Sequence, residues 1–295
     1  MGHAIGVIAA EKIAVGLVDG HRIVGDVVAS EGLSSVPADA VAPLIYGLIE
    51  RACGAGGVDC AKISAIGIGF PGIIRDGIVQ DSPNLPQTKG MNLRQSMRAV
   101  LAAKNSPAPV LLLNDADAMA AGLAATLGQL EKMIRVWTLG NGIGFGRYPQ
   151  TEGAGEGGHT VVTLDPKETY CGCGGVGHLE GIMGHRAMRL RFLDMEPEEV
   201  FEEARGGDKR CCEFVRLWHR ALAAATATHI HLDGPGKFFV SGPNSVYLET
   251  PLLSQFLHEM VKMSPLQGSV FEVIPTSQEI AIVGAAVNAN LAHPE

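Results

Sequence analysis

The sequence contains few aromatic residues, no cluster of basic side chains and no long apolar run. Aromatic residues make up 5% of the 295 residues, and 31 acidic residues outnumber 23 basic ones, which gives a formal net charge of −8. Binding to a nucleic-acid backbone needs concentrated positive charge, so we expect no nucleic-acid partner. The apolar runs are short and interrupted by glycine or charged residues, so the pattern predicts no membrane span.

Signals of export and of disulfide bonding are also missing. The first residues, MGHAIGVIAAEK, contain no basic segment followed by a cleavage site, so we expect no secretory signal. Six cysteines are spread over the chain, and four of them lie in apolar or helical surroundings: Cys53, Cys60, Cys211 and Cys212. This distribution favours a reducing compartment over a disulfide framework, and we predict a cytoplasmic protein.

The first half of the chain is predicted to form one α/β unit. Hydrophobic residues make up 46% of the whole sequence, enough to bury one large core or two medium-sized ones. Residues 4–29 predict a meander of three strands, with a hairpin turn at Asp19 and Gly20. The elements expected after the meander are a helix over residues 37–52 and buried strands over residues 63–70 and 109–115.

The second half repeats this change from strands to helices. The elements expected there are helices over residues 116–126, 198–205, 211–232, 245–263 and 279–291, and strands over residues 134–140, 143–148, 237–242 and 269–275. Because each half opens with hairpin strands, the pattern predicts two α/β lobes with a cleft between them. The predicted N-terminal lobe comprises residues 1–116 and 279–295, and the predicted C-terminal lobe comprises residues 117–278.

Two glycine patterns could bind phosphate groups. Gly67-Ile-Gly69-Phe-Pro71-Gly72 fits the dinucleotide fingerprint G-x-G-x-x-G, but Pro71 and the following IIRDGIV predict extended chain instead of the required helix. We therefore reject a dinucleotide site there. The run LGNGIGFG, residues 139–146, lies between two predicted strands, where glycines let backbone amides approach an anion closely. A tight hairpin explains the same run equally well.

The segment DPKETYCGCGGVGHLEG, residues 165–181, is the most specific signal in the sequence. Cys171 and Cys173 are too close in sequence for an easy mutual disulfide, yet two thiolates at this spacing can hold one ion. His178 adds a nitrogen donor, and His159 supplies a fourth ligand, so we predict a tetrahedral zinc site. The alternative is a glycine-rich loop with two buried free thiols. A DNA-binding zinc finger fits poorly, because the chain is acidic and the ligand order differs.

These residues carry a resemblance to a known family. Gly155-Glu-Gly-Gly-His159 followed by Cys171-Gly-Cys-Gly-Gly-Val-Gly-His-Leu-Glu180 resembles the signature of the ROK family of repressors, open reading frames and sugar kinases. Further segments that resemble the family are PVLLLNDADAMAAGLA, GFPGII, SPNLP and AIVGAAVNA. The resemblance implies an actin-like, ribonuclease H-like pair of α/β lobes, with ATP and a hexose in the interdomain cleft, and one structural zinc ion.

The resemblance also implies roles for individual residues on the sugar side. Asp115 matches the family's catalytic aspartate, which accepts the proton of the attacking sugar hydroxyl; the alternative is a helix N-cap. Four residues match groups that bind sugar hydroxyls in the family: Asn114, Glu156, His159 and Glu180. His159 can do so with one ring nitrogen while the other binds zinc. His178 stands where the family has a third cysteine, which exchanges one zinc donor for another.

On the nucleotide side the sequence departs from the family pattern. The family begins with an Asp-x-Gly-Gly-Thr turn, and the matching stretch here is Val7-Ile8-Ala9-Ala10-Glu11. Val7 cannot hold a magnesium-bound water, and Glu11 places a carboxylate where the phosphates come. A charge about 5 Å from a phosphate costs roughly 3 kcal/mol at an effective dielectric constant of about 20, which weakens binding by on the order of 100-fold unless it is neutralised. Lys12 could compensate.

The other residues that the resemblance assigns to ATP lie further along the chain. They belong to a second phosphate turn, where Asn141 stands in place of the family's threonine, and to a segment under adenosine, where Val240-Ser241-Gly242-Pro243 replaces a glycine triplet. The expected ATP ligands, with Mg²⁺ as the accompanying ion, are Lys12, Gly140, Asn141, Gly142 and Gly242.

Two functions remain open from the sequence. One is an ATP-dependent kinase acting on a hexose or N-acetylhexosamine with Asp115 as the base. The other is a catalytically impaired sugar-binding sensor, favoured by the altered turn at Val7, Ala9, Ala10 and Glu11. A repressor needs an N-terminal winged helix-turn-helix, and this sequence starts at the first predicted strand, so we expect no repressor. The resemblance further implies a small-molecule sugar as partner and a homo-oligomer, in the form of a dimer.

Overall fold

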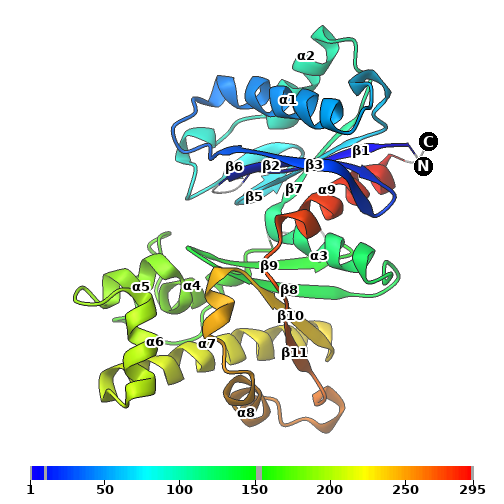
Figure 1. Cartoon of the computed structure of the whole chain (residues 1–295). Helices are drawn as coiled ribbons and strands as arrows, with labels where there is room; N and C mark the ends of the chain where they lie inside the picture. Colours follow the sequence, from blue (N-terminus) through cyan, green and yellow to red (C-terminus); the bar gives the residue numbers. More distant parts are fainter. Residues whose placement is uncertain (1, 10–11, 151–154, 294–295) are drawn as a thin grey trace. The chain divides into compact units, whose positions relative to one another are not determined.

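The computed structural model describes residues 2–9, 12–150 and 155–293, and the chain forms two compact units (Figure 1). Unit 1 comprises Met1–Arg135, Gly146–Gly155 and Ser277–Glu295, and unit 2 comprises Val136–Phe145 and Glu156–Thr276. None of the helices within the described residues combines the length and apolar character that a membrane span needs.

Unit 1 is built on a five-stranded sheet with the strand order β3-β2-β1-β4-β7. These strands are β1 (Ala4–Ala9), β2 (Lys12–Asp19), β3 (Arg22–Glu31), β4 (Ile66–Phe70) and β7 (Val110–Asn114). β1, β2 and β3 are antiparallel neighbours, whereas β4 is parallel to β1 and to β7. The predicted meander is therefore confirmed, with Asp19 paired to Arg22 across the hairpin.

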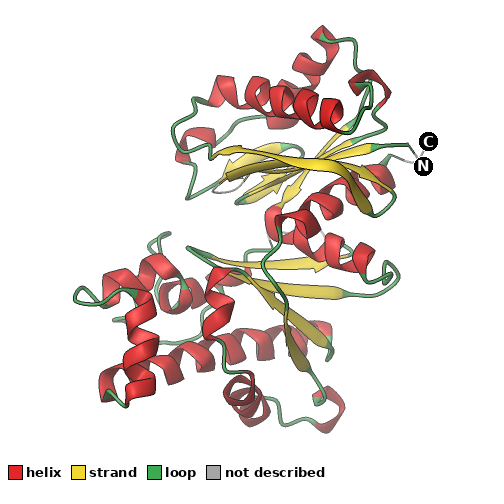
Figure 2. Cartoon of the chain, viewed as in Figure 1, coloured by secondary structure: helices red, strands yellow, loops and turns green. Residues whose placement is uncertain are grey.

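Helices cover both faces of this sheet (Figure 2). The helices of unit 1 are α1 (Ala38–Ala55), α2 (Leu93–Ala103), α3 (Asp115–Thr126) and α9 (Gln278–Ala292). α1 and α2 pack on one face, and the main hydrophobic core of the unit lies between them and the strands. α9 and α3 pack on the opposite face, where α9 crosses β1 and β4. Unit 1 thus has three layers, with the sheet in the middle.

Glycines allow α9 to lie directly on the strands beneath it. A Cβ atom on Gly6 of β1 would stand 1.9 Å from the carbonyl oxygen of Ile282, and one on Gly67 of β4 would stand 1.8 Å from that of Ala285. The glycine at position 67 therefore serves close packing of a helix on a sheet. The segment after Gly72 forms a small hairpin of β5 (Ile73–Arg75) and β6 (Ile78–Asp81), which confirms the predicted extended chain.

Unit 2 contains a four-stranded sheet with the strand order β11-β10-β8-β9. Its strands are β8 (Ile134–Leu139), β9 (Ile143–Tyr148), β10 (Lys237–Ser241) and β11 (Val270–Val273). Its helices are α4 (Leu179–Met183), α5 (His185–Arg191), α6 (Pro197–Gly206), α7 (Lys209–Asp233) and α8 (Thr250–Met260). β10 is parallel to both β8 and β11, so the carboxyl ends of these three strands share one edge of the sheet.

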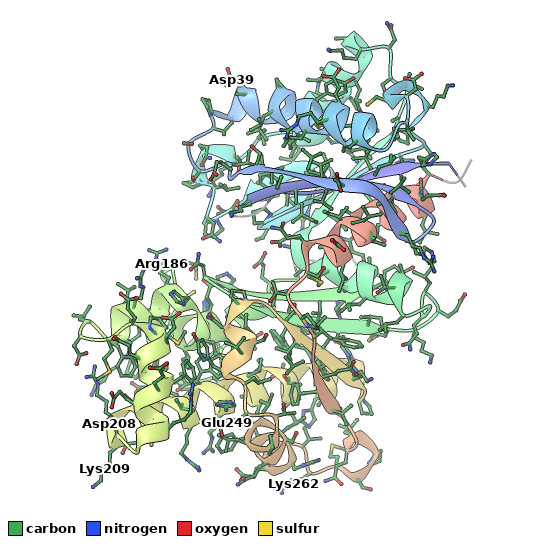
Figure 3. All side chains as sticks on the ribbon, viewed as in Figure 1. Asp39, Arg186, Asp208, Lys209, Glu249 and Lys262 are labelled. Carbon is green, nitrogen blue, oxygen red and sulfur yellow. The ribbon has the colours of Figure 1, made fainter. Side chains whose placement is uncertain are left out.

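The long helix α7 is the central support of unit 2. Its first residue is Lys209, and Asp208 is the N-cap; both are labelled in Figure 3. The Asp208 side chain accepts a hydrogen bond of 2.9 Å from the backbone N–H of Cys211. Trp137 of β8 donates a buried hydrogen bond of 3.1 Å from its indole nitrogen to the hydroxyl oxygen of Thr226 in α7. The sheet and the helix are thereby fixed to each other through a fully buried aromatic residue.

Most elements expected from the sequence are present, and the differences have local causes. α2, α4 and α5 were not predicted. For α4 and α5 the reason is that they lie in or directly after a glycine-rich segment. The expected helix over residues 245–263 is a 3-10 turn at Pro243–Tyr247 followed by α8. The predicted lobe boundary after residue 116 stays a prediction; the contacts group all of α3 with unit 1, because α3 packs along α9.

The α3–α9 contact generates a stability prediction. A Cβ atom on Gly122 would stand 1.8 Å from the carbonyl oxygen of Ile280, whereas one on Gly47 in α1 would meet nothing within 4 Å. We expect Gly122→Ala to lower the free energy of unfolding by about 1–3 kcal/mol through overpacking. The matched variant Gly47→Ala should raise it by roughly 0.5–1 kcal/mol through helix propensity. Urea unfolding measures both, and a Gly122→Ala protein as stable as the parent would contradict the close helix contact.

Candidate functional site

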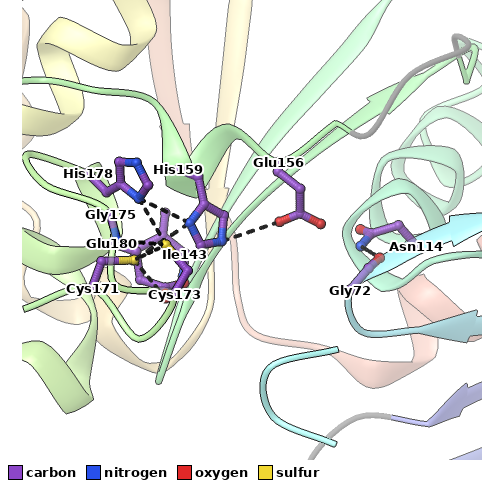
Figure 4. A network of polar contacts seen from close by, with 10 residues as sticks. All are labelled: Gly72, Asn114, Ile143, Glu156, His159, Cys171, Cys173, Gly175, His178 and Glu180. Atoms are coloured by element: carbon purple, nitrogen blue, oxygen red, sulfur yellow. Dashed lines mark hydrogen bonds and ion pairs between the residues drawn. The ribbon is translucent and has the colours of Figure 1, made fainter. Parts of the chain in front are cut away.

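Two thiols and two imidazoles converge in unit 2 at the predicted zinc site (Figure 4). The Sγ atoms of Cys171 and Cys173 are 3.4 Å apart, and the Nδ1 atoms of His159 and His178 are 3.3 Å apart. Cys171 Sγ lies 3.6 Å from His159 Nδ1, and Cys173 Sγ lies 3.3 Å from His178 Nδ1. All four donor atoms lie within 4.8 Å of one another.

These spacings fit a single tetrahedral ion. Zinc bonds of about 2.3 Å to sulfur and about 2.0 Å to nitrogen separate two sulfurs by about 3.8 Å, sulfur from nitrogen by about 3.5 Å and two nitrogens by about 3.3 Å. The S···S distance is 3.4 Å, two of the four S···N distances are 3.6 and 3.3 Å, and the N···N distance is 3.3 Å. The donor set of two thiols and two imidazoles is also one that zinc prefers.

The local chain explains how four donors come so close together. His159 ends a 3-10 helix at Gly157–His159, and His178 is the residue directly before α4. An antiparallel bridge joins Val161 to His178 and brings the two histidine segments side by side. A Cβ atom on Gly175 would stand 2.1 Å from the His178 ring, so only glycine leaves room for the imidazole there.

Burial shifts the pKa of two of these donors, Cys171 and His178. It raises the pKa of the Cys171 thiol to about 12, so without a nearby cation this thiol stays protonated at neutral pH. Burial also lowers the pKa of His178, which favours the neutral imidazole that binds metals. A bound cation would reverse the balance for the thiol, because a coordinating thiol loses its proton.

Glu156 lies on the outer side of His159. Its Oε2 atom is 3.7 Å from His159 Nε2, the ring nitrogen that faces away from the cluster. A carboxylate beside the free nitrogen of a metal-binding histidine fixes the tautomer in which the other nitrogen is available to the ion. Of these two residues, both expected to bind sugar hydroxyls, His159 is thus a member of the Cys/His cluster and Glu156 lies beside it.

Glu180 connects the metal site to the turn between β8 and β9. Its Oε2 atom accepts a hydrogen bond of 3.0 Å from the backbone N–H of Ile143, and the Cys171 thiol lies 3.7 Å from its Oε1 atom. A Cβ atom on Gly142 would stand 2.6 Å from the same carboxylate, so glycine is needed there. The role of Glu180 in holding this turn was not predicted, because no sequence pattern links residues 143 and 180.

The structure brings four of the expected ATP ligands together in unit 2. Gly140, Asn141 and Gly142 follow β8, and Gly242 follows the parallel neighbour β10, so all four lie at the carboxyl edge of the sheet. Gly242 has a φ of 100°, and a Cβ atom there would stand 2.4 Å from the carbonyl oxygen of Leu139. Open α/β sheets bind ligands at this edge. Here the expected threonine hydroxyl is absent, because residue 141 is asparagine.

Asn114 and Asp115 lie in unit 1 where β7 meets α3. The Asn114 amide oxygen accepts a hydrogen bond of 2.8 Å from the Ala116 N–H, and its nitrogen donates one of 3.0 Å to the carbonyl oxygen of Gly72 (Figure 4). Asn114 is therefore the N-cap of α3. The alternative role of Asp115 as the cap is wrong, because Asp115 is the first residue inside the helix.

Burial raises the pKa of the Asp115 carboxyl group above its ordinary value. Asp117, two residues further along α3, has a pKa raised to about 6, mainly by burial, although its Oδ1 atom accepts a hydrogen bond of 2.9 Å from the backbone N–H of Arg147. Sequence reasoning did not single out Asp117. The sequence feature that could have identified it is the Asp-Ala-Asp spacing at the start of a helix, which places two acidic residues in the first turn.

The altered N-terminal turn is only partly described. Val7 and Ala9 point into the hydrophobic core of unit 1 and are fully buried. Ala10 and Glu11 lie outside the described residues. Lys12 is the first residue of β2 and is exposed. In the described residues around this turn, the end of β1 therefore directs apolar side chains into the core, and the start of β2 exposes the basic side chain of Lys12 to solvent.

The comparisons with known proteins agree with the resemblance in the sequence. The model of the ROK family matches residues 5–291. The chain is 31% identical to a glucokinase of Thermotoga maritima over 255 residues, which cover 75% of this chain and 77% of the relative. It is 29% identical to a glucokinase of Pyrobaculum calidifontis over 241 residues, which cover 76% of this chain and 78% of the relative.

A solved structure extends the likeness to the fold. The crystal structure of a ROK hexokinase from Thermus thermophilus matches with a TM-score of 0.81 and 25% identity, over 98% of both chains. The predicted two-lobed, actin-like α/β fold is thereby confirmed. Together with the family match over nearly the whole sequence, this shows that the chain belongs to the ROK family.

Proposed function

We propose that this chain is an ATP-dependent sugar kinase that transfers the γ-phosphate of ATP to a hydroxyl of a hexose or N-acetylhexosamine. The observation that carries the proposal is the placement of Asp115. It stands at the carboxyl end of a buried parallel strand, inside the first turn of α3, with Asn114 performing the capping. Two curated relatives at 29% and 31% identity are glucokinases.

In the proposed reaction, Asp115 accepts the proton of the sugar hydroxyl while the hydroxyl oxygen attacks the γ-phosphorus and the bond to the ADP oxygen breaks. Burial raises the pKa of this carboxyl group, which makes its ionised form a stronger base than an exposed aspartate. The hydrogen bonds of Asn114 to Ala116 and Gly72 keep the start of α3 fixed while the proton moves.

The sugar is proposed to be held by Asn114, Glu156, His159 and Glu180. The two thiols and two imidazoles of Cys171, Cys173, His159 and His178 would hold a structural zinc ion, since their spacing fits one. That ion would supply no chemistry to the transfer; it would fix the loop that carries Glu180 and the ring of His159. His159 then offers its Nε2 atom, beside Glu156, to a sugar hydroxyl.

ATP is proposed to bind at the carboxyl edge of the unit 2 sheet through Gly140, Asn141, Gly142 and Gly242, with Lys12 and a Mg²⁺ ion neutralising the phosphates. The backbone of a glycine-rich turn suits phosphate oxygens. Because position 7 is a buried valine, the acid that organises magnesium in the family pattern has no counterpart there. We expect weak ATP binding in consequence.

A sugar-binding sensor without turnover is the second candidate, favoured by the apolar Val7 and Ala9. A coupled assay of ADP release across hexoses and N-acetylhexosamines separates the two functions. ATP-dependent turnover supports the kinase. Sugar binding by calorimetry without any ADP release on the same sugars supports the sensor and overturns the kinase. A homodimer and a cytoplasmic location remain predictions from the resemblance.

The first prediction from the proposed function concerns the catalytic base. Asp115→Asn should lower kcat by about 10²–10⁴-fold, because the neutral amide cannot accept the proton. In the parent, the rate should fall as the pH drops through the raised pKa of Asp115, so the acid limb should lie above the ordinary carboxyl value of 3.8. Rates of ADP release measured against pH test both statements, with the exposed Asp194→Asn as control. An Asp115→Asn enzyme with parental kcat would exclude Asp115 as the base.

The second prediction concerns the metal. Inductively coupled plasma mass spectrometry on freshly purified protein should find one zinc ion per chain. Cys173→Ser should lose most of it, because a serine hydroxyl is a far weaker zinc ligand than a thiolate. Cys212→Ser, which changes a cysteine outside the cluster, should retain the ion. Parent protein without bound zinc, or full zinc content in Cys173→Ser, would refute the proposed site.

A further inference from the structure

Arg191, at the end of α5, makes an ion pair with Glu168 in the segment that leads to the zinc ligands. Its Nη1 atom donates a hydrogen bond of 3.0 Å to Glu168 Oε1, and its Nη2 atom contacts Glu168 Oε2. The guanidinium carbon lies 4.4 Å from the ring centre of Tyr170 and 5.5 Å from that of Phe214. The side chains of Arg191 and Glu168 are only 17% and 12% exposed.

This one guanidinium reaches both ends of the zinc-binding loop. Glu168 lies three residues before Cys171 and Tyr170 directly before it. Arg191 Nη2 also lies 3.5 Å from the carbonyl oxygen of Gly181, which follows Glu180. The two ends are in contact, because a Cβ atom on Gly181 would stand 2.9 Å from the Cys171 nitrogen. Arg191 therefore closes a loop that contains three of the four donors and Glu180.

The backbone of Glu168 connects this ion pair to the segment that carries His178. The carbonyl oxygen of Glu168 accepts a hydrogen bond of 2.8 Å from the N–H of Gly177, the residue before His178. Fixing Glu168 therefore fixes the chain before Cys171 and the chain before His178 together. A loop whose ends and centre are held in this way loses less conformational entropy when its donors close on an ion.

We propose that Arg191 is a positioning residue that holds residues 168–181 in the metal-binding conformation before the ion arrives. Through the same loop it positions Glu180 for sugar; this second part rests on the proposed function. A lysine cannot replace it, because an ammonium group lacks the planar fork that pairs with Glu168 and stacks on Tyr170. The partner Glu168 keeps the buried guanidinium neutralised.

A second arginine offers a matched control on the same unit. Arg210 also pairs with a carboxylate through two hydrogen bonds, of 2.9 and 3.1 Å to Asp194, and its guanidinium carbon lies 4.5 Å from the ring centre of Phe192. The side chains of this pair are 52% and 59% exposed. Arg210 and Asp194 lie outside residues 168–181, so a change there removes a similar pair without touching the loop.

The test uses metal-free full-length protein titrated with Co²⁺, whose visible absorption reports tetrahedral coordination by sulfur and nitrogen, followed by competition with a chelator. We expect Arg191→Lys and Glu168→Gln to weaken metal affinity by about 10–100-fold, as loss of groups that orient metal ligands does. Arg210→Lys should bind with parental affinity. In the zinc-loaded enzyme, Arg191→Lys should raise the KM for sugar while kcat stays near the parental value.

Parental metal affinity in both Arg191→Lys and Glu168→Gln would overturn the inference, even if thermal unfolding showed lower stability. An equal loss of affinity in Arg210→Lys would also overturn it, because the effect would then be one of general stability. Glu168→Gln, which preserves side-chain shape, decides the matter if Arg191→Lys does not fold. The metal titration needs no turnover, so it tests the role of Arg191 even if the protein has no kinase activity.

Discussion

The convergence of two sulfur and two nitrogen atoms is the feature on which the proposed conformation of the loop with the predicted sugar ligands depends. The four donor atoms lie within 4.8 Å of one another, and one cation could bind all of them at once. The surrounding chain is rich in glycine and contributes few buried side chains of its own. Contacts link the cluster to the turn after β8: Cys171 contacts both His159 and Glu180, and Glu180 accepts a hydrogen bond from the backbone N–H of Ile143.

Much of this site could be predicted from the sequence, because the chemistry of its residues is local. The C-x-C spacing and two histidines identify the donors, and a strand followed by Asn-Asp identifies the start of α3. The contacts of Glu180 with Ile143 and of Arg191 with Glu168 could not be predicted, since each joins residues far apart in sequence with no recurring pattern. That Asn114 and not Asp115 caps the helix also needed coordinates, because both side chains cap well.

The glycines show why a motif alone misleads. Gly67 fits a dinucleotide fingerprint, yet it is a glycine because the backbone of α9 lies against it. Gly142 and Gly242, in contrast, leave room for the Glu180 carboxylate and for the Leu139 carbonyl group at the carboxyl edge of a sheet. With Val7 and Ala9 buried in the core of unit 1, phosphate binding would depend on this edge of unit 2 more heavily than the family pattern implies.

The central claim is that one ion, held by two thiolates and two imidazoles, fixes the loop on which sugar binding depends. X-ray absorption at the zinc K edge of purified protein tests it most directly. We expect two sulfur neighbours at about 2.3 Å and two nitrogen neighbours at about 2.0 Å from the zinc. A spectrum dominated by oxygen neighbours, or with a single sulfur, would contradict the claim.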